Sequence, residues 1–416
     1  MMRRVLMLTT FYPPYSFGGD AVDVQLWAGA FARRGCEVTV VHDRDAYLAL
    51  ASAPQPRHVP EPGVEVITLS SPAGRVGLLL AHQSGRPLVH GAALTRLCAE
   101  RRFDTVIFAN VSLLGGPSVF SLCPEAVRIA VATDHWLICP THVLWRYDGV
   151  ACDERRCLRC TLAHGRPPQL WRYAGLLERA ARNIDLFIAR SEFSRRKHEE
   201  YGFAPRMEVV PLFVPPPPPA RGESLHDRPY FLFVGRVEEL KGLADVLPLF
   251  MTDRGADLVI AGTGTAETKL RESTRASPHI RWLGFVPRHE LGAWYGHAIA
   301  LIVPSRTYET FGIIVIEAFS HGTPVIVRRR GPLPELLERG GGGLVFDTAP
   351  ELDSALCSLL DRPALRQSLS DEALRSFHTH WSEEAVVPAL LALVERARAR
   401  RAAGTQHYRG AAEKPS

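Results

Sequence analysis

Five consecutive prolines, at positions 215–219, interrupt the sequence near its middle. A proline run is stiff and extended, and it lacks the backbone donors that a helix or a sheet needs. The same pattern stands on both sides of this run: a short apolar stretch, a glycine-bearing loop, and a stretch with helical periodicity. Because 416 residues suffice for two domains of about 200 residues each, residues 215–229 are predicted to link two α/β halves.

Each half opens like a Rossmann-type unit. Residues 5–10 and 36–42 are predicted strands around a helix at 21–34, and the second half restarts with a strand at 230–234 and a helix from residue 243. The predicted fold class is therefore α/β, with an N-terminal domain at 1–214 and a C-terminal domain at 230–380. A last helix is expected at about 382–401, followed by a disordered tail at 404–416.

Charge and hydropathy exclude several classes of protein. The net charge of +5 comes from scattered residues rather than basic blocks, so no nucleic-acid partner is expected. No stretch reaches the roughly 18 apolar residues of a membrane span, and the first strand is too short for a signal core. We therefore expect a cytoplasmic protein with reduced cysteines. The helical segments at 75–102 have apolar and basic faces. These faces either pack or are solvated, or they touch a lipid-linked acceptor or an anionic membrane surface, which would place the protein at the inner face of the membrane.

Two loops carry residues suited to a diphosphate. Arg236 and Lys241 stand five positions apart on a strand-to-helix loop, and lysine is rare in this chain. Such a cationic pair can bind a diphosphate and stand in for a metal ion. Gly18 and Gly19 would let the backbone approach phosphates closely, although a tight turn explains them equally well. Gly262 and Gly264 supply only part of a dinucleotide fingerprint, which argues against a nicotinamide cofactor.

Two glutamates flank a predicted helix start. Glu309 lies in a loop after the apolar run 298–303, and Glu317 falls in the second turn of a helix that starts near Gly312. Ligands of open α/β sheets lie at this edge, where the first amides of a helix are unpaired donors. The two carboxylates could therefore hold two hydroxyl-bearing parts of one ligand. The backbone of residues 280–286, ending at Val286, could pair with a base edge.

Polar residues also follow a predicted strand of the first half, at 127–132. Asp134 and His135 could orient or deprotonate an acceptor hydroxyl, whereas a histidine beside Trp136 is otherwise a packing residue.

Four of the eight cysteines lie within 22 residues. Cys157 and Cys160 have the spacing of half a tetrahedral zinc site, and Cys139 and Cys152 could complete it. Four thiolate ligands would leave no open position, so such a zinc ion would be structural. Free thiols and a redox-labile pair are the alternatives.

An ordered series of motifs resembles the retaining GT-B glycosyltransferases of glycosyltransferase family 4, over nearly all of residues 1–400. The series consists of Gly235-Arg236 with Lys241-Gly242, Gly262-Thr-Gly264, Gly284-Phe-Val286, Glu309 with Phe311-Gly312 and Glu317, and Gly322-Thr-Pro324. The resemblance implies two Rossmann-like domains facing across a cleft, with the last helix returning to the first domain. The segment from Thr133 to Pro140 and its later cysteines resemble members from polysaccharide clusters, many of which carry histidine in place of Thr133.

The same resemblance implies a role for each matched residue. Arg236 and Lys241 would bind the diphosphate, with Gly18 and Gly19 facing it. Glu309 would lie near the donor sugar, with backbone contacts from Phe311, Gly312 and Ile313, and Glu317 would hold the ribose. The implied reaction is retaining transfer of a hexosyl group from a nucleotide-diphosphate sugar to a glycan or lipid-linked acceptor, without a catalytic metal. A nucleotide-sugar epimerase and a non-catalytic nucleotide-sugar-binding module remain alternatives.

Overall fold

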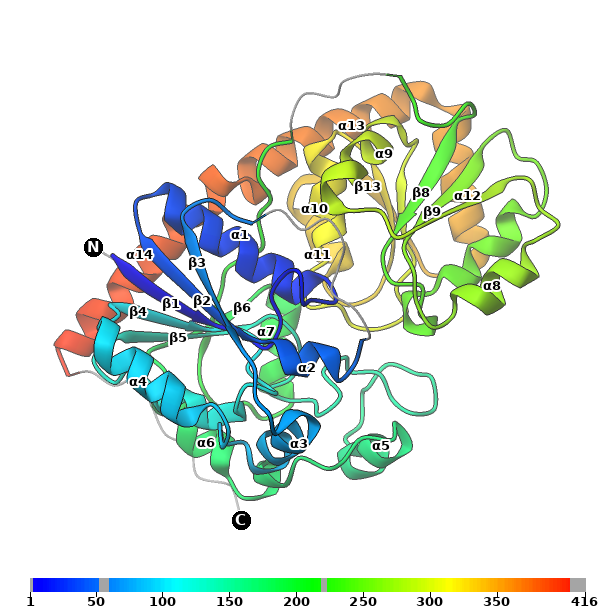
Figure 1. Ribbon diagram of the computed structural model, residues 1–416. Coiled ribbons are helices and arrows are strands. Elements are labelled where there is room, and N and C mark those ends of the chain that lie inside the picture. Colours follow the sequence, from blue (N-terminus) through cyan, green and yellow to red (C-terminus); the bar gives the residue numbers. More distant parts are fainter. Residues whose placement is uncertain (1–2, 52–59, 218–222, 405–416) are drawn as a thin grey trace, which may run out of the picture. The chain divides into compact units, whose positions relative to one another are not determined.

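The computed structural model describes residues 3–51, 60–217 and 223–404 (Figure 1). The central prolines 218 and 219 and the predicted tail from 405 lie outside these ranges. Two compact units emerge: residues 1–143, 154–211 and 387–416 form the first, and residues 144–153 and 212–386 form the second. Each unit is built around its own parallel sheet.

The first unit contains a seven-stranded sheet with the order β3-β2-β1-β4-β5-β6-β7, in which every pairing is parallel. When helices pack on both faces of a parallel sheet, its strands are mostly apolar throughout. Accordingly, β4 and β5 are fully buried. The strands are β1 (Arg4–Leu8), β2 (Glu37–Asp43), β3 (Val64–Leu69), β4 (Thr105–Phe108), β5 (Val127–Ala132), β6 (Leu186–Ala189) and β7 (Met207–Val209).

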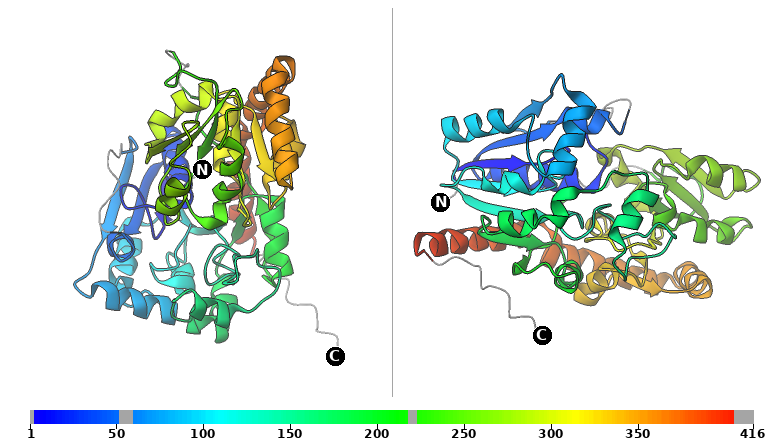
Figure 2. Two further views of the ribbon diagram at one scale, coloured as in Figure 1. Left: turned by 90° about the vertical axis from the view of Figure 1, so that its right-hand side faces the viewer. Right: turned by 90° about the horizontal axis from the view of Figure 1, so that it is seen from below.

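Helices connect these strands, as parallel neighbours require. The main ones, which Figures 1 and 2 show from three sides, are α1 (Gly19–Arg33), α2 (Arg44–Leu48), α3 (Gly74–Ser84), α4 (Gly91–Arg101), α5 (Cys157–Ala163), α6 (Leu176–Ala181) and α7 (Glu192–Glu200), with short 3-10 turns η1 (Gly116–Ser121) and η2 (Leu170–Tyr173).

The second unit contains a six-stranded parallel sheet with the order β10-β9-β8-β11-β12-β13. Strands β8 and β9 are buried along their whole length, and their apolar side chains form the core of this unit. The strands are β8 (Tyr230–Val234), β9 (Asp257–Ala261), β10 (Ile280–Gly284), β11 (Leu301–Val303), β12 (Val325–Arg328) and β13 (Gly343–Phe346).

The helix expected from residue 243 does not form. Three short 3-10 turns, η3 (Glu239–Lys241), η4 (Leu243–Asp245) and η5 (Leu247–Phe250), take its place, and Pro248 lies in the first turn of η5. Proline lacks a backbone donor and restricts the residue before it, which disfavours a continuous helix here. The other helices are α8 (Glu267–Ser273), α9 (Leu291–His297), α10 (Ile313–Ser320), α11 (Leu333–Gly340), α12 (Ala349–Asp361), α13 (Pro363–Ser376) and α14 (Glu383–Ala402), with η6 (Arg288–Glu290) before α9 and a π-helical turn, η7 (Phe377–Trp381), between α13 and α14.

Both sheets reverse their strand order at one place. In the first unit the order runs outward from β1 on one side and from β4 on the other, and in the second unit the same holds for β8 and β11. Loops that leave such neighbours at their carboxyl ends diverge and leave a crevice for a ligand. Two positions in this molecule are therefore favoured for binding, one in each unit.

Helix α14 has residues in both units, since residues up to 386 group with the second unit and residues from 387 with the first. Its last turns are fixed to the first unit, where Arg401 pairs with Asp185 at 3.2 Å. None of the helices in the described ranges combines the length and the apolar content that crossing a bilayer requires.

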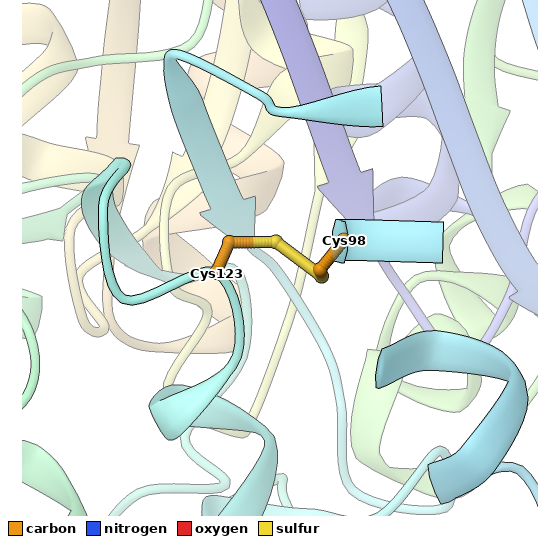
Figure 3. The surroundings of a disulfide bond; sticks show 2 residues. All are labelled: Cys98 and Cys123. Carbon is orange, nitrogen blue, oxygen red and sulfur yellow. A yellow bond between two sulfur atoms is a disulfide. The ribbon is translucent and has the colours of Figure 1, made fainter. Parts of the chain in front are cut away.

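One disulfide departs from the expectation of reduced cysteines. Cys98 of α4 is joined to Cys123, which follows η1 (Figure 3). Neither cysteine belongs to the cluster at 139–160, and their separation of 25 positions matches no short cysteine motif. The pairing arises from the fold, which brings the end of α4 beside the loop that leads into β5.

Reduction of this disulfide should destabilise the protein by about 3 kcal/mol, because a free chain regains the entropy that closing a loop of this length removes. Urea unfolding followed with and without dithiothreitol measures the difference. The variant Cys98→Ser should start at the lower midpoint and not respond to reductant. A variant as stable as the oxidised protein would show that the disulfide does not stabilise the fold.

Candidate active site

In the second unit, a cluster of hydrogen-bonded polar side chains joins the loop after β8 to the loop after β11. These are the two strands at which the strand order reverses. Lys241 donates a hydrogen bond from Nζ to Oε1 of Glu309 at 2.6 Å, and Ser305 donates to the same oxygen at 2.7 Å. Both charged side chains are about one-fifth exposed. The structure thus brings together a cation and a carboxylate that the sequence separates by 68 positions, at the edge where a ligand is expected.

The carboxylate of Glu309 is held ionised. Burial by itself would raise its pKa, but the charge and hydrogen bond of Lys241, the hydroxyl of Ser305 and the charge of Arg236 together lower it. Arg236 is half-exposed and pairs with Glu238 at 2.7 Å. Both predicted cations thus act on Glu309, Lys241 through a direct contact and Arg236 through its field.

A helix start lies beside this pair. Gly312 caps α10 with a φ of 115°, a left-handed conformation that favours glycine, and Ile313 is the first helical residue. The first amides of α10 have no partner within the helix and carry the positive end of its dipole. An oxyanion next to Lys241 would therefore meet both side-chain and backbone donors. The side chain of Phe311 is buried against Trp381, so that only its backbone is left for a ligand.

Glu317 in the second turn of α10 has partners that the sequence did not indicate. Arg288 donates to its Oε1 at 2.7 Å, and the hydroxyl of Tyr295 donates to its Oε2 at 3.1 Å. Burial, together with the charge and hydrogen bond of Glu317, raises the pKa of Tyr295, so this hydroxyl stays protonated. Glu317 is thus a fixed acceptor that is 12 % exposed and paired with an exposed arginine.

The glycines of the 262–264 loop have a packing role. A Cβ on Gly262 would lie 1.8 Å from the carbonyl oxygen of Gly235, and a Cβ on Gly264 would lie 2.4 Å from that of Val237. The loops after β8 and β9 can approach each other only because both residues are glycine. These glycines therefore shape the loop that carries Arg236, whatever they contribute to a ligand. Val286 follows β10 and is half-buried.

The first unit has its own polar cluster at the carboxyl ends of its strands. The side-chain amide of Asn110, after β4, donates to Asp20 in the first turn of α1 at 3.2 Å and to Asp134, after β5, at 2.9 Å. His142 binds the same oxygen of Asp134 through Nδ1 at 2.8 Å. The three connecting segments come from both sides of the β1–β4 reversal, so the cluster occupies the place expected for a ligand.

The hydrogen bond with Asp134 fixes the orientation of the His142 ring. Burial would raise the pKa of Asp134, but the charge and hydrogen bond of His142 and the backbone amide of Trp136 hold it below its ordinary value. Because Nδ1 of His142 is engaged with the carboxylate, its Nε2 is the ring atom left for another partner. An imidazole fixed in this way by a carboxylate can accept a proton from a hydroxyl group or hold that hydroxyl in place.

His135 does not face an acceptor, which corrects the expectation from the sequence. It is 1 % exposed, and its ring lies 5.9 Å from that of His198 inside the first unit. The chain turns after β5 so that Asp134 lies at the sheet edge while His135 points into the interior. His142 was missed because it lies eight positions after Asp134, with a φ of 73° that no local pattern indicates.

Asp20 follows the predicted glycine pair, whose surroundings are open. An added Cβ on Gly18 or Gly19 would meet nothing within 4 Å, and Gly18 caps α1 with a φ of 133°. Burial and the nearby charge of Asp134 raise the pKa of Asp20 to about 6. Two carboxylates share one amide donor here, so this end of the first unit is adapted to a cation or to hydroxyl donors.

This shift predicts a pH-dependent stability. Since the folded pKa of about 6 lies above the unfolded value of 3.8, the folded state holds the proton more tightly, and stability falls as pH rises from about 4 to 6. Asp20→Asn should therefore be more stable than the wild type at pH 8, by up to about 3 kcal/mol, and equal to it at pH 3.5. Urea unfolding at the two pH values measures this. Parallel profiles of the two proteins would contradict the assignment.

The four-cysteine zinc site is not assembled. Among the residues that the structure describes, no three histidine, cysteine, aspartate or glutamate side chains gather as a metal site. The sulfur of Cys139 lies 3.2 Å from the hydroxyl of Thr141, and Cys157 and Cys160 both belong to α5. Cys152 lies in the segment 144–153, which groups with the second unit. Spacing alone could not reveal that the four cysteines are divided between two units.

Comparison with known proteins agrees with this architecture. Residues 17–216 match the family described as Glycosyltransferase Family 4, and residues 219–375 match Glycosyl transferases group 1. A glycogen synthase of Mycobacterium tuberculosis (strain CDC 1551 / Oshkosh) is 32 % identical over 169 residues, which are 38 % of this chain and 40 % of that protein. The match thus spans about two-fifths of the length of this relative.

Solved structures share the fold over most of the chain. The sucrose-phosphate synthase of Thermosynechococcus elongatus superposes with a TM-score of 0.72 at 17 % identity, covering 95 % of this chain and 99 % of the other. Anabaena HepE in complex with UDP-glucose gives a TM-score of 0.66 at 16 % identity, covering 95 % and 100 %.

Two parallel Rossmann-like sheets in separate units define a GT-B fold. The chain belongs to the family 4-type glycosyltransferases of this fold.

Proposed function

We propose that this protein is a retaining glycosyltransferase that moves a hexosyl group from a nucleotide-diphosphate sugar to a glycan or lipid-linked acceptor. The observation that carries this proposal is the contact between Lys241 and Glu309 beside the start of α10. A cation, a carboxylate and unpaired amides at one strand reversal suit a ligand that has both a diphosphate and a hydroxyl-rich sugar. The UDP-glucose bound to Anabaena HepE supports a donor of this class.

The donor is assigned to the second unit. Lys241, Arg236 and the first amides of α10 would bind the diphosphate, and Glu317 would hold the ribose hydroxyls with Arg288 beside them. Glu309 would position the sugar, while keeping the ammonium group of Lys241 in place when no donor is bound. Val286 and its neighbours offer backbone groups to the base. Each cation contributes up to about 4 kcal/mol of Coulomb attraction at 4 Å and an effective dielectric of 20, before desolvation.

The chemistry breaks the bond between the anomeric carbon and the diphosphate oxygen, through a transition state with oxocarbenium character. Negative charge grows on the departing diphosphate at this point, so Lys241 and Arg236 stabilise the transition state more than the bound donor. The acceptor hydroxyl forms the new bond on the same face of the sugar and passes its proton to the departing diphosphate. We propose that these side chains provide the charge without an added metal, as turnover in the presence of EDTA would test.

The acceptor is assigned to the first unit, where Asp134 and His142 form the oriented pair. Nε2 of His142 would hold the acceptor hydroxyl, and Asp134 would keep the ring in that orientation. The resemblance of the segment 133–140 to members from polysaccharide clusters favours an acceptor in cell-surface polysaccharide or glycoconjugate synthesis.

The decisive experiment screens UDP-, GDP- and ADP-hexoses for release of nucleoside diphosphate with simple glycan and lipid-linked acceptors. An acceptor-dependent release, with a product whose anomeric configuration by NMR equals that of the donor, is the expected result. An inverted product would contradict retention. A donor converted to its epimer without an acceptor would favour the epimerase, and tight donor binding without any turnover would favour the non-catalytic binding module.

A further inference from the structure

The first unit exposes an unusual number of large apolar side chains in two segments. Half of the exposed large hydrophobic residues in the described part of the chain lie within residues 76–88 and 158–173. On α3 they are Val76, which is 66 % exposed, Leu79 and Leu80, and on α5 they are Leu158 and Leu162. Single exposed leucines are ordinary, whereas a contiguous group of them marks an interaction surface.

The second segment contacts the first through η2. The indole of Trp171 in η2 donates to the carbonyl oxygen of His82 in α3 at 3.0 Å, and η2 begins seven positions after the end of α5. Figure 1 shows α3 and α5 at the same margin of the first unit. Trp171 is buried, and Arg172 lies over its ring and donates to the carbonyl of Leu137. The exposed residues therefore stand on a fixed base.

The charge of this surface has one sign. Residues 155–173 contain five arginines and residues 70–99 contain three, and neither segment contains an aspartate or a glutamate. The whole chain, in contrast, has nearly as many acidic as basic residues, 44 against 49. Arg75 and Arg86 in or near α3 and Arg155 and Arg159 at α5 are exposed. Arginine around exposed leucine is the composition of protein surfaces that insert between anionic head groups.

We propose that the exposed side chains of residues 75–88 and 155–173, here called the apolar–basic face, bind the surface of an anionic lipid bilayer. The leucines would enter the boundary between head groups and acyl chains, and the arginines would pair with lipid phosphates. The charge complementarity selects an anionic bilayer over a neutral one and over a second copy of this face, because two copies would juxtapose their arginines. The inference concerns binding only and does not depend on the proposed transfer reaction.

Flotation of the full chain with vesicles tests this proposal. The wild type should float with vesicles of phosphatidylcholine that contain about 30 mol% phosphatidylglycerol, and not with phosphatidylcholine alone. The double variant Leu158→Ser/Leu162→Ser should lose at least about tenfold in partition. Leu225→Ser/Met251→Ser, which replaces two exposed apolar residues of the second unit, is the matched control and should bind like the wild type.

The arginines are tested separately. Arg75→Glu/Arg159→Glu should weaken binding by more than about fivefold per arginine, whereas Arg75→Lys/Arg159→Lys should retain it. Equal binding to neutral and anionic vesicles, or full binding by the leucine variant, would overturn the proposal. A dimer in light scattering that Leu158→Ser/Leu162→Ser dissociates would show instead that this face joins two copies. Circular dichroism of each variant excludes loss of folding as the cause.

Discussion

Replacing Lys241 by alanine should lower kcat for sugar transfer by about 100- to 1,000-fold, with a smaller change in the KM for the donor. The ammonium group is positioned before the donor arrives, because Glu309 and the loop after β8 hold it at the strand reversal. A donor that fits beside it gains little in the ground state and most when charge develops on the leaving diphosphate. The measurement is steady-state release of nucleoside diphosphate at saturating acceptor.

A double-mutant cycle separates catalysis from simple charge pairing. Without Lys241 the partly buried Glu309 loses the main factor that lowers its pKa and keeps only the hydroxyl of Ser305 and the charge of Arg236, so Lys241→Ala should also destabilise the fold, and Glu309→Gln should relieve part of that loss. The combined variant should regain stability without regaining turnover. Lys269→Ala is the matched control, since Lys269 is exposed on α8 and should affect neither quantity. Turnover restored in the combined variant would show that Lys241 only neutralises Glu309.

In the second unit the place of the candidate site could be predicted, because it depends on short-range patterns. The apolar strand before residue 304 and the glycine before Ile313 place Glu309 and the helix start at one sheet edge without further information. The alternation of strands and helices indicated a parallel sheet but not that β8 and β11 are neighbours, so the contact between Lys241 and Glu309 is known only from the structure. Arg288 could not be predicted as the partner of Glu317, because 29 positions and an entire helix separate them.

In the first unit the sequence indicated the place of the polar cluster and one of its residues, Asp134, but not the partners of Asp134. Asp134 lies where the strand pattern puts it, but its partners His142 and Asn110 come from loops whose course no periodicity specifies. For His135 the sequence left two interpretations open, an acceptor contact and a packing role, and the turn after β5 buries its side chain. The zinc prediction failed for a similar reason. Sequence spacing does not show that residues 144–153, which include Cys152, group with the second unit.

His142→Asn should lower kcat for transfer by about 100-fold and leave hydrolysis of the donor in the absence of acceptor unchanged. Asparagine suits this test because it tolerates the positive φ of 73° at this position, so the loop should keep its conformation. The variant removes the imidazole whose Nε2 is available once Asp134 holds Nδ1. General-base or positioning groups of this kind contribute about 100- to 10,000-fold.

Asp134→Asn tests whether the carboxylate acts through the ring. If Asp134 only orients His142, the combined variant should be no slower than His142→Asn alone, which is the non-additivity expected of residues that work as one unit. The exposed His378 provides the control, since His378→Ala should leave transfer unchanged. A full rate for His142→Asn with every acceptor would remove His142 from the reaction, and additive losses would mean that Asp134 contacts the acceptor itself.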